Sequence, residues 1–497
     1  MPVSTYRPVL ASDWPRRQVK GAGGSNREHL YGNASAPDLS PGALPARRRP
    51  NTMLMLHISD IHFKHGEIGY DDDPNRGLRD DLVHDVRHMR TRLGSPGMIL
   101  LSGDIAYAGR KDEYDFAYSW LLNDLCPAAG CEIENVLSIP GNHDVDLKAE
   151  DNPAFEAARR DLRATKPADV DRKLVKWLHD PFASQILFGP LENYNRHFAA
   201  KLLCPIGPYN VRGKDGKVVE NVSKPYVRRD VELNDGSALR IWGFNSVLVS
   251  DLSDAENTML VDPAAAQITR ADGVAHLVMC HHPFNWIKNR VPFQERMEGV
   301  VQVQLFGHEH TERVDEHRYF VRVRAGALQP DRDAPGWRPG YNWIDASVDE
   351  VEGRRKLRVK VWARAHEVDH FTPVFDRNQN EAHENLIDLP AWQRPRQPAR
   401  IERNEDEMAE AVPQAMELLP MVEPPKPVTV RSVATKIFRL REPEQRRLIA
   451  QMKLDETGDN DLKDYEVAIA AVRRAARRGD LGELDREIDA ILADEGR

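Results

Sequence analysis

Five short polar motifs, rich in residues that bind metal ions, occur in one order along this chain of 497 residues. They are Asp60-Ile61-His62, Gly103-Asp104, Gly141-Asn142-His143-Asp144, His281-His282-Pro283 and Gly307-His308-Glu309-His310. Imidazole, carboxylate and amide oxygen ligands, with no thiolate among them, suit Mn, Fe, Zn, Co or Ni. The residue types therefore fit a pair of metal ions, with one acid to spare, better than a proton relay alone.

Each motif directly follows an apolar run, and that run predicts the element that positions the motif. The runs cover residues 53–58, 98–101, 136–139, 277–280 and 301–306. Short apolar runs that end in Gly, Asn, Asp and His are typical of buried strands that give way to loops. In a layered α/β protein the carboxyl ends of such strands gather along one edge, where ligands bind. We therefore expect the five motifs to converge on one site.

With these motifs the chain resembles the calcineurin-like metallophosphoesterases, whose pattern is D-x-H, G-D, G-N-H-D/E, H and G-H-x-H. The resemblance covers roughly residues 53–375 and implies a four-layer α/β/β/α sandwich. It also implies two divalent metal ions, with manganese favoured in vitro. The implied ligands are Asp60, His62 and His310 for the first ion, Asn142, His281 and His308 for the second, and Asp104 as a bridge between them.

The resemblance implies separate roles for the remaining polar residues. Two ions roughly 3.5 to 4 Å apart can hold the attacking and departing oxygens and lower the pKa of a bridging water, so the nucleophile is a metal-bridging hydroxide. His143 is then the candidate that protonates the leaving alkoxide or holds the phosphoryl oxygens. Asp144 would orient His143 or the neighbouring loop amides. His282 could contact the substrate or only shape its loop with Pro283.

Tyr107 suggests a different metal chemistry. It completes a G-D-x-x-Y string, in which the tyrosine of purple acid phosphatases binds ferric iron. The first motif of those enzymes lacks a histidine, whereas His62 is present here and would take the same coordination position. We therefore expect Tyr107 to pack without binding a metal.

The expected activity is metal-dependent hydrolysis of a phosphodiester, because the motifs look most like those of bacterial phosphodiesterases that act on nucleotides. One alternative is a nuclease effector, which would need a basic track or an aromatic platform beside the metals. A phosphomonoesterase or protein phosphatase is another, since these classes share the fold and the metals. An inactive scaffold is disfavoured because the ligand candidates and His143 are all intact.

Composition limits the cellular setting. The net charge is −9, charged residues make up 30% of the chain, and no apolar stretch approaches the length of a membrane span. Four cysteines without C-x-x-C pairs favour a reducing cytoplasm. Residues 1–51 are rich in Pro, Gly, Ser and Arg and lack an apolar signal segment, so we expect a disordered tail, and Met53 is a candidate start.

The sequence also predicts three further segments. Helical patterns broken by prolines indicate a helical cap within an insertion at 150–235, and later strands at 318–323, 341–348 and 357–365 are expected to complete a second sheet. A Pro-rich charged linker is expected at 376–427. The helical periods in 428–497 predict about four helices, which resemble the small adaptor modules of bacterial effector enzymes. Such a module would bind a protein partner or self-associate.

One helix of this module carries an arginine stripe. Arg473, Arg474, Arg477 and Arg478 lie on it near its carboxyl end, where basic residues complement the helix dipole. The stripe fits either a docking face or a solvated helix side, and a solvated side is favoured.

Overall fold

The computed structural model describes residues 53–70, 73–146, 152–208, 224–329, 337–394 and 428–494. All of them belong to one compact unit. The expected N-terminal tail and most of the expected linker lie outside the described residues. None of the helices in the described ranges combines the length and the apolar character that a bilayer crossing needs.

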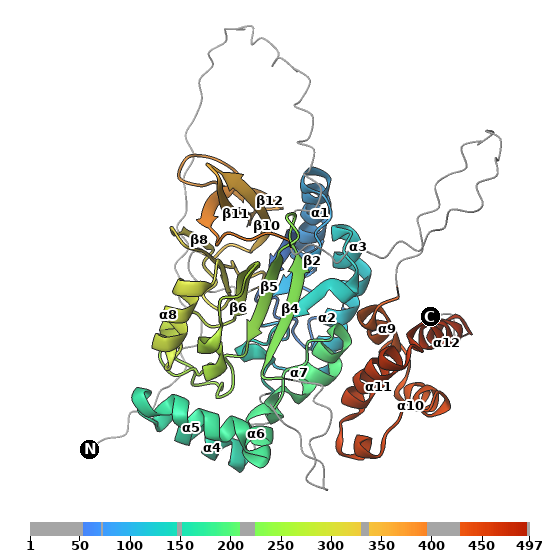
Figure 1. Ribbon diagram of the computed structural model, residues 1–497. Helices are drawn as coiled ribbons and strands as arrows, with labels where there is room; N and C mark the ends of the chain where they lie inside the picture. Colours follow the sequence, from blue (N-terminus) through green and yellow to red (C-terminus); the bar gives the residue numbers. More distant parts are fainter. Residues whose placement is uncertain are drawn as a thin grey trace, which may run out of the picture. The chain divides into compact units, whose positions relative to one another are not determined.

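Two mixed β-sheets form the centre of this unit (Figure 1). The first has the order β12 (His370–Val374), β11 (Arg354–Glu367), β10 (Gly340–Val351), β1 (Met53–Ile58), β2 (Met98–Leu101) and β3 (Val136–Ser138), and β13 (His383–Asp388) also pairs with β11. The second has the order β4 (Tyr226–Glu232), β5 (Ala238–Phe244), β6 (Val274–Cys280), β7 (Val303–Phe306), β9 (Val321–Arg324) and β8 (Arg313–Glu316). The five apolar runs that precede the motifs are confirmed as β1, β2, β3, β6 and β7.

Side-chain alternation along β6 shows how the layers pack. Leu277 and Met279 belong to the core that also contains Leu100 of the first sheet. Val278 and Cys280 point to the opposite face, where they pack with Phe293 of helix α8 (Arg290–Val300). A strand covered on both faces in this way has no polar face, which explains its continuous apolar sequence.

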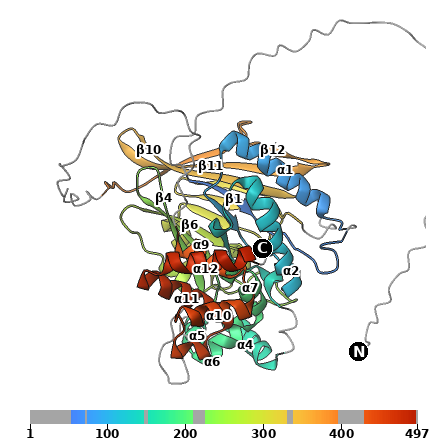
Figure 2. The ribbon, with the colours of Figure 1, turned by 90° about the vertical axis from the view of Figure 1, so that its right-hand side faces the viewer.

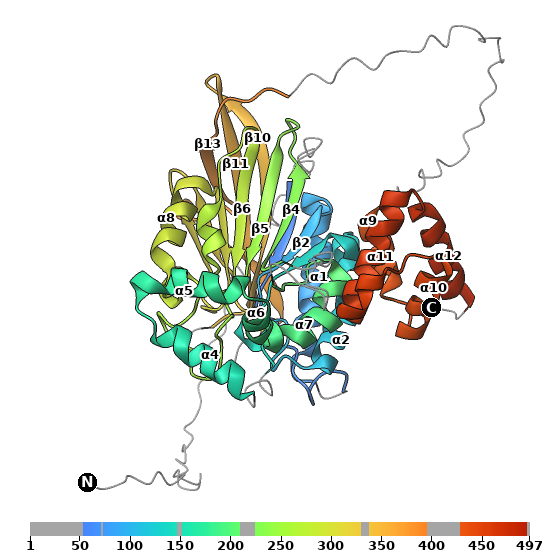
Figure 3. The same cartoon turned by 60° about the horizontal axis from the view of Figure 1, so that its bottom comes forward.

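Helix α1 (Arg76–Leu93) covers the outer face of the first sheet. Its buried Asp85 accepts hydrogen bonds from Tyr341 of β10 at 2.6 Å and from Arg364 of β11 at 2.7 and 2.9 Å. Helix α2 (Lys111–Trp120) follows on the same side (Figure 3), and the short helix α3 (Cys126–Ala129) lies beside α1 (Figure 1). With α8 outside the second sheet, the order of layers is α/β/β/α, as the sequence predicted.

Two expectations about the later strands are wrong. Strands β10 and β11 do not complete the second sheet, because β10 pairs antiparallel with β1, for example Ile344 with Met55. In addition, residues 383–388 of the expected linker form β13, which pairs with β11 along its whole length. Alternation of apolar and polar residues indicates a half-buried strand but does not identify its partner, which the tertiary structure selects.

The insertion contains helices α4 (Pro153–Ala164), α5 (Pro167–His179), α6 (Pro181–Phe188) and α7 (Glu192–His197). Prolines occupy the first positions of α4, α5 and α6 and do not interrupt helices. Proline is tolerated there because the backbone N–H that it lacks would have no hydrogen-bond partner within the first turn of the helix. Arg163 joins α4 to the loop after β5 through Asp251, at 2.8 Å. The helical part of this segment is followed by β4.

Four helices follow the undescribed linker: α9 (Val430–Ile437), α10 (Glu442–Gln451), α11 (Asp464–Arg478) and α12 (Leu481–Asp494). They share a core of their own that includes Val433, Leu448, Val472 and Ile488. We refer to residues 428–494 as the C-terminal module.

The C-terminal module contacts the rest of the chain through several fixed interactions (Figure 2). Arg431 of α9 donates hydrogen bonds to the carbonyl oxygens of Glu134 and Leu202, both at 2.8 Å. Tyr465 and Ile469 of α11 pack against Ala200 of the short turn η6 (Ala199–Leu202). A linker rich in proline and charge usually joins units that share few fixed contacts. The expected linker would therefore predict fewer contacts than the structure shows, and that prediction is wrong.

The arginine stripe is also only partly solvated. Arg474 is buried and donates to both carboxylate oxygens of Asp459, at 2.6 and 2.7 Å. Arg477 and Arg478 are exposed. Arg474 therefore fixes the turn that precedes α11, whereas Arg477 and Arg478 are solvated.

Candidate metal centre

The five motifs lie together at the carboxyl ends of β1, β2, β3, β6 and β7. Backbone hydrogen bonds connect the loops directly: the amide of Asp60 donates to the carbonyl of Gly103, and the amide of Gly307 donates to the carbonyl of His281, both at 3.0 Å. Each of these bonds joins two loops of the same sheet, and the amide of Leu328, which follows β9, joins the sheets by donating to the carbonyl of Asp60 at 3.1 Å. Residues far apart in sequence therefore share one edge.

Two glycines of the motifs permit this close approach. Gly103 has a φ of 107°, and a Cβ atom there would lie 2.5 Å from Nδ1 of His281. At Gly141 a Cβ atom would lie 2.1 Å from Oδ1 of Asp104. Any larger residue at either position would displace a candidate metal ligand.

Asp104 lies at the centre of the site and is fully enclosed, with 1% of its side chain exposed. Its Oδ2 atom lies 3.1 Å from Nε2 of His62 and 3.3 Å from Nε2 of His281. Its Oδ1 atom accepts a hydrogen bond from the backbone amide of His143 at 2.8 Å. One carboxylate thus faces ligand atoms from the first and the fourth motif, as a bridging ligand must.

The other candidate ligands flank Asp104 on two sides. The amide oxygen of Asn142 lies 3.1 Å from Nε2 of His281 and 3.0 Å from Nδ1 of His308. On the other side, Nε2 of His310 lies 3.6 Å from Oδ1 of the buried Asp60. The structure therefore brings together all seven residues that the sequence predicted as ligands.

Two backbone carbonyls orient the histidines. Nδ1 of His62 donates to the carbonyl oxygen of Gln329, and Nδ1 of His281 donates to that of Ser102, both at 2.9 Å. Since a carbonyl can only accept, each Nδ1 carries the proton and each Nε2 is left to bind a cation. Gln329 and Ser102 could not be predicted from sequence, because backbone groups act here and any residue type supplies them.

Backbone strain is concentrated in the candidate ligands. Five of them have positive φ angles, namely Asp60 (55°), His62 (51°), Asp104 (55°), His308 (68°) and His310 (27°). Residues with a Cβ atom rarely adopt this conformation, and it persists where the surrounding structure imposes it, often at functional sites. The strain aims the side chains of three loops at one point.

The electrostatics fit a cation at this point. Burial lowers the pKa of His62 and of His281, but the charge and hydrogen bonding of Asp104 outweigh burial and raise each pKa to about 9. Burial opposes ionisation of Asp104, yet the charges of His281 and His143 hold its pKa well below the usual range. Without a metal, protons on the imidazoles thus balance the charge of the buried carboxylates. A divalent metal ion that binds here supplies that positive charge instead and releases the protons.

Three groups of ligand atoms are close enough to share an ion, each within 4.8 Å of one another: Asp60, Asp104 and His281; His62, Asp104 and His143; and His281, His282 and His308. Two of the groups share Asp104, and two share His281. The donor set of imidazole and carboxylate matches the metals expected from the sequence.

His143 and Asp144 occupy different positions beside this centre. Nδ1 of His143 donates to the carbonyl of Tyr107 at 2.7 Å, so Nε2 is the atom that can gain or lose a proton. Asp144 is buried and accepts hydrogen bonds from the amides of Ile105, Ala106 and Gly141. Burial and then the charge of Asp104 raise the pKa of Asp144 to about 7. Asp144 thus orients loop amides rather than the imidazole of His143.

His282 lies behind the candidate ligands. It is fully buried, its ring centre lies 4.5 Å from that of His308, and its Nδ1 atom is 2.9 Å from the Ser246 hydroxyl oxygen. Burial and the neighbouring His308 and His281 keep its pKa well below the usual range. Because His282 is buried, we infer that it packs against His308 and holds it in place, and does not contact a substrate.

Two aromatic rings border the centre on opposite sides. The ring of Tyr107 lies 5.2 Å from that of His143, with the ammonium of Lys64 4.9 Å from its centre. The ring of Trp286 lies 4.1 Å from that of His308. The sequence did not single out Trp286 as a site residue. Its only signal is its position, three residues after Pro283 of the fourth motif.

The calcineurin-like phosphoesterase family model matches residues 53–312, a little over half of the chain. The chain belongs to this family. As a calcineurin-like phosphoesterase it is expected to use divalent metal ions, and all seven candidate ligands, from Asp60 to His310, fall within the matched range.

Two relatives of this phosphoesterase show partial similarity. Glycerophosphodiester phosphodiesterase GpdQ of Enterobacter lignolyticus (strain SCF1) is 33% identical over 139 residues, which cover 27% of this chain and 42% of the relative. The metallophosphoesterase-like protein YydB of Bacillus subtilis (strain 168) is 22% identical over 327 residues, which cover 62% of this chain and 59% of the relative. The chain therefore spans less than two thirds of either relative.

A solved structure of Vacuolar Protein Sorting 29 from Cryptosporidium parvum covers 68% of this chain and 100% of its own, with 9% identity and a TM-score of 0.29.

Proposed function

We propose that this phosphoesterase hydrolyses phosphodiesters of the nucleotide class with two divalent metal ions. Asp60, His62 and His310 would hold one ion, and Asn142, His281 and His308 the other. The observation that carries the proposal is the position of Asp104, whose Oδ2 atom lies 3.1 Å from His62 and 3.3 Å from His281. A single carboxylate between two sets of ligands is the arrangement that a pair of cations requires.

The chain's own residues would divide the remaining chemistry. When bound, the two cations supply Lewis acidity and lower the pKa of a water molecule that they share. His143 would donate a proton from Nε2 to the departing alkoxide oxygen, because its Nδ1 is fixed on the carbonyl of Tyr107. Asp144 would hold the loops that carry Asp104 and Asn142 together, because it accepts hydrogen bonds from the amides of Ile105 and Gly141.

Two observations favour a nucleotide diester. The matched relative GpdQ is named a glycerophosphodiester phosphodiesterase, which acts on a diester. Trp286 is partly exposed beside His308, where its ring can stack on a nucleobase. The same ring would serve a single-stranded nucleic acid, so a nuclease is the second candidate.

A substrate panel tests the proposal. The full chain with Mn²⁺ would be assayed on bis(4-nitrophenyl) phosphate, 4-nitrophenyl phosphate, cyclic nucleotides, and single-stranded and duplex nucleic acid. We expect hydrolysis of the model diester and of a cyclic nucleotide, with the diester hydrolysed faster than the monoester. Faster hydrolysis of the monoester contradicts the diesterase assignment. Cleavage of nucleic acid without hydrolysis of cyclic nucleotides selects the nuclease.

Variants at Trp286 separate the nucleobase contact from the chemistry. Trp286→Ala should raise KM for the cyclic nucleotide while KM for bis(4-nitrophenyl) phosphate changes less, and Trp286→Phe should restore binding. Trp177, a partly buried tryptophan of α5, offers a matched control as Trp177→Phe. An equal loss on both substrates would show that Trp286 only supports His308.

A further inference from the structure

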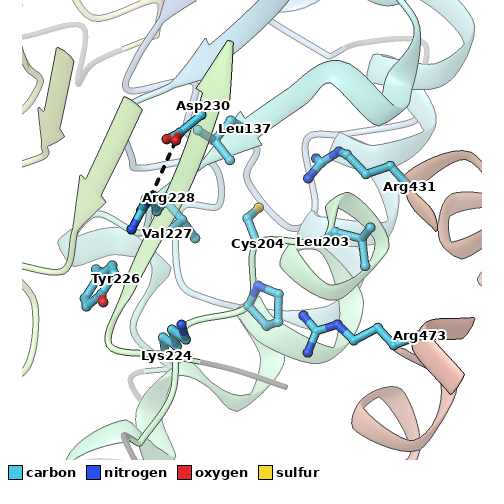
Figure 4. Close-up of a pocket in the computed structure, with 11 residues that line it drawn as sticks. Leu137, Leu203, Cys204, Lys224, Tyr226, Val227, Arg228, Asp230, Arg431 and Arg473 are labelled. Atoms are coloured by element: carbon cyan, nitrogen blue, oxygen red, sulfur yellow. Dashed lines mark hydrogen bonds and ion pairs between the residues drawn. The ribbon is translucent and has the colours of Figure 1, made fainter. Parts of the chain in front are cut away.

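A cavity apart from the candidate metal centre lies between the C-terminal module and the edge strand β4 (Figure 4). Its volume is about 550 Å³, and its walls come from β4, the segment after η6, α9 and α11. None of the candidate metal ligands lines it. Small-molecule sites commonly measure about 300 to 1,000 Å³, so this cavity has the size of a binding site.

Positive charge dominates the lining. Lys224 and Arg228 approach from β4 and the residues before it, and Arg431 and Arg473 approach from the C-terminal module (Figure 4). The one acidic residue of the lining is Asp230. Both oxygens of Asp230 accept hydrogen bonds from Arg240, at 2.8 and 2.7 Å, so a residue outside the lining provides its main partner. Within the lining, Nη2 of Arg228 lies 3.5 Å from Oδ2 of Asp230, the contact dashed in Figure 4.

Arg431 adds a half-buried positive charge, and burial outweighs the opposing charge interactions, including that of Glu134, and lowers its pKa. Its guanidinium bonds to backbone carbonyls, and it shares the carbonyl oxygen of Glu134 with Arg229, whose Nη1 lies 3.3 Å from that oxygen. Burial, and then the nearby charge of Arg431, lower the pKa of Arg229 to about 10. Two half-buried guanidinium groups held side by side in this way attract an anion.

We propose that this cavity binds a phosphorylated small molecule of the nucleotide class, whose phosphate groups contact Lys224, Arg431 and Arg473. Tyr226 also lines the cavity; its ring centre lies 5.5 Å from that of Trp242, and the partly exposed remainder of the ring would contact the base. Since the ligand would touch β4 and both α9 and α11, it would fasten the C-terminal module to the sheet. This inference is independent of the proposed hydrolysis, because the cavity holds none of the candidate ligands.

Calorimetry with α,β-methylene-ADP, whose P–C–P bond resists hydrolysis, tests the proposal on the full chain with its metals. Inhibition of bis(4-nitrophenyl) phosphate hydrolysis by the same compound reports binding at the metal centre. We expect Lys224→Gln combined with Arg473→Gln to weaken binding at the cavity by at least about tenfold. The inhibition constant and the uninhibited rate should stay unchanged.

Two further variants complete the experiment. Arg486→Gln, on the exposed side of α12 and away from the lining, should bind as the native chain does. Arg228→Gln replaces the double variant if the latter does not fold, and should also weaken binding. The proposal is overturned if affinity is unchanged in the cavity variants, or if all binding follows the inhibition constant and disappears with the metals.

Discussion

Asp104 connects the two halves of the candidate metal centre at the scale of single residues. Because its Oδ2 atom faces both His62 and His281, we predict that Asp104→Ala loses both metal ions together with activity. The rate should fall at least about 100-fold, and further than in His308→Ala, which removes a ligand of one ion. Elemental analysis of the purified protein measures the metals. Asp112→Ala removes an exposed carboxylate outside the site and serves as the control. Near-normal turnover with two equivalents of Mn in the Asp104 variant contradicts the assignment.

His143 should affect the rate without affecting the metals. Its backbone amide, which donates to Asp104, remains in His143→Ala, so we expect metal content to be kept while kcat falls about 100-fold. The loss should be smaller for nitrophenolate esters, which need less protonation of the leaving group, than for alkyl esters. Comparing kcat on the two ester types checks this. An equal loss on both would leave His143 with phosphate positioning alone.

At the scale of elements, the loop after β3 must pass very close to the loop after β2. A Cβ atom at Gly141 would lie 2.1 Å from Oδ1 of Asp104, so we predict that Gly141→Ala displaces Asp104, lowers metal content and reduces activity at least about tenfold. Gly189→Ala is the matched control, because a Cβ atom there meets nothing within 4 Å. Metal analysis and the model diester assay decide the outcome, and full activity in Gly141→Ala would show that the loops can separate without loss.

At the scale of the whole molecule, strand β13 determines where the chain can be truncated without loss of stability. A chain ending at Phe375 loses β13 and with it the buried Ile387, whereas a chain ending at residue 394 keeps both. Burial of an aliphatic side chain contributes roughly 1.5 to 3 kcal/mol, so we expect the shorter chain to melt about 2 to 4 °C lower. Thermal unfolding followed by circular dichroism measures the difference. Equal melting temperatures would show that β13 adds no stability.

The same two chains test the C-terminal module. The chain ending at residue 394 should still bind two metals and hydrolyse the small diester, because all candidate ligands lie before that point. It should nevertheless be less stable than the full chain, since the contacts of Arg431 and Tyr465 are lost. An inactive or insoluble product would make the module part of the catalytic fold.

The sequence alone predicted the residues that the structure gathers at the candidate metal centre. Their types set the chemistry, and the apolar run before each motif predicted the strand that carries it, since both signals are local. The family resemblance that these motifs carry implied the layered fold. Local patterns also located α9 to α12 closely, because helical periodicity is complete within a few turns.

Only the tertiary structure decided which distant segments meet. The pairing of β10 with β1, the strand β13 within the expected linker and the fixed contacts of the C-terminal module all join residues far apart in the chain. Alternation along a strand reports burial of one face and leaves the partner open. The carbonyls that orient His62 and His281, and the cavity lined by Arg431 and Arg473, depend on this assembly and have no signature of their own in the sequence.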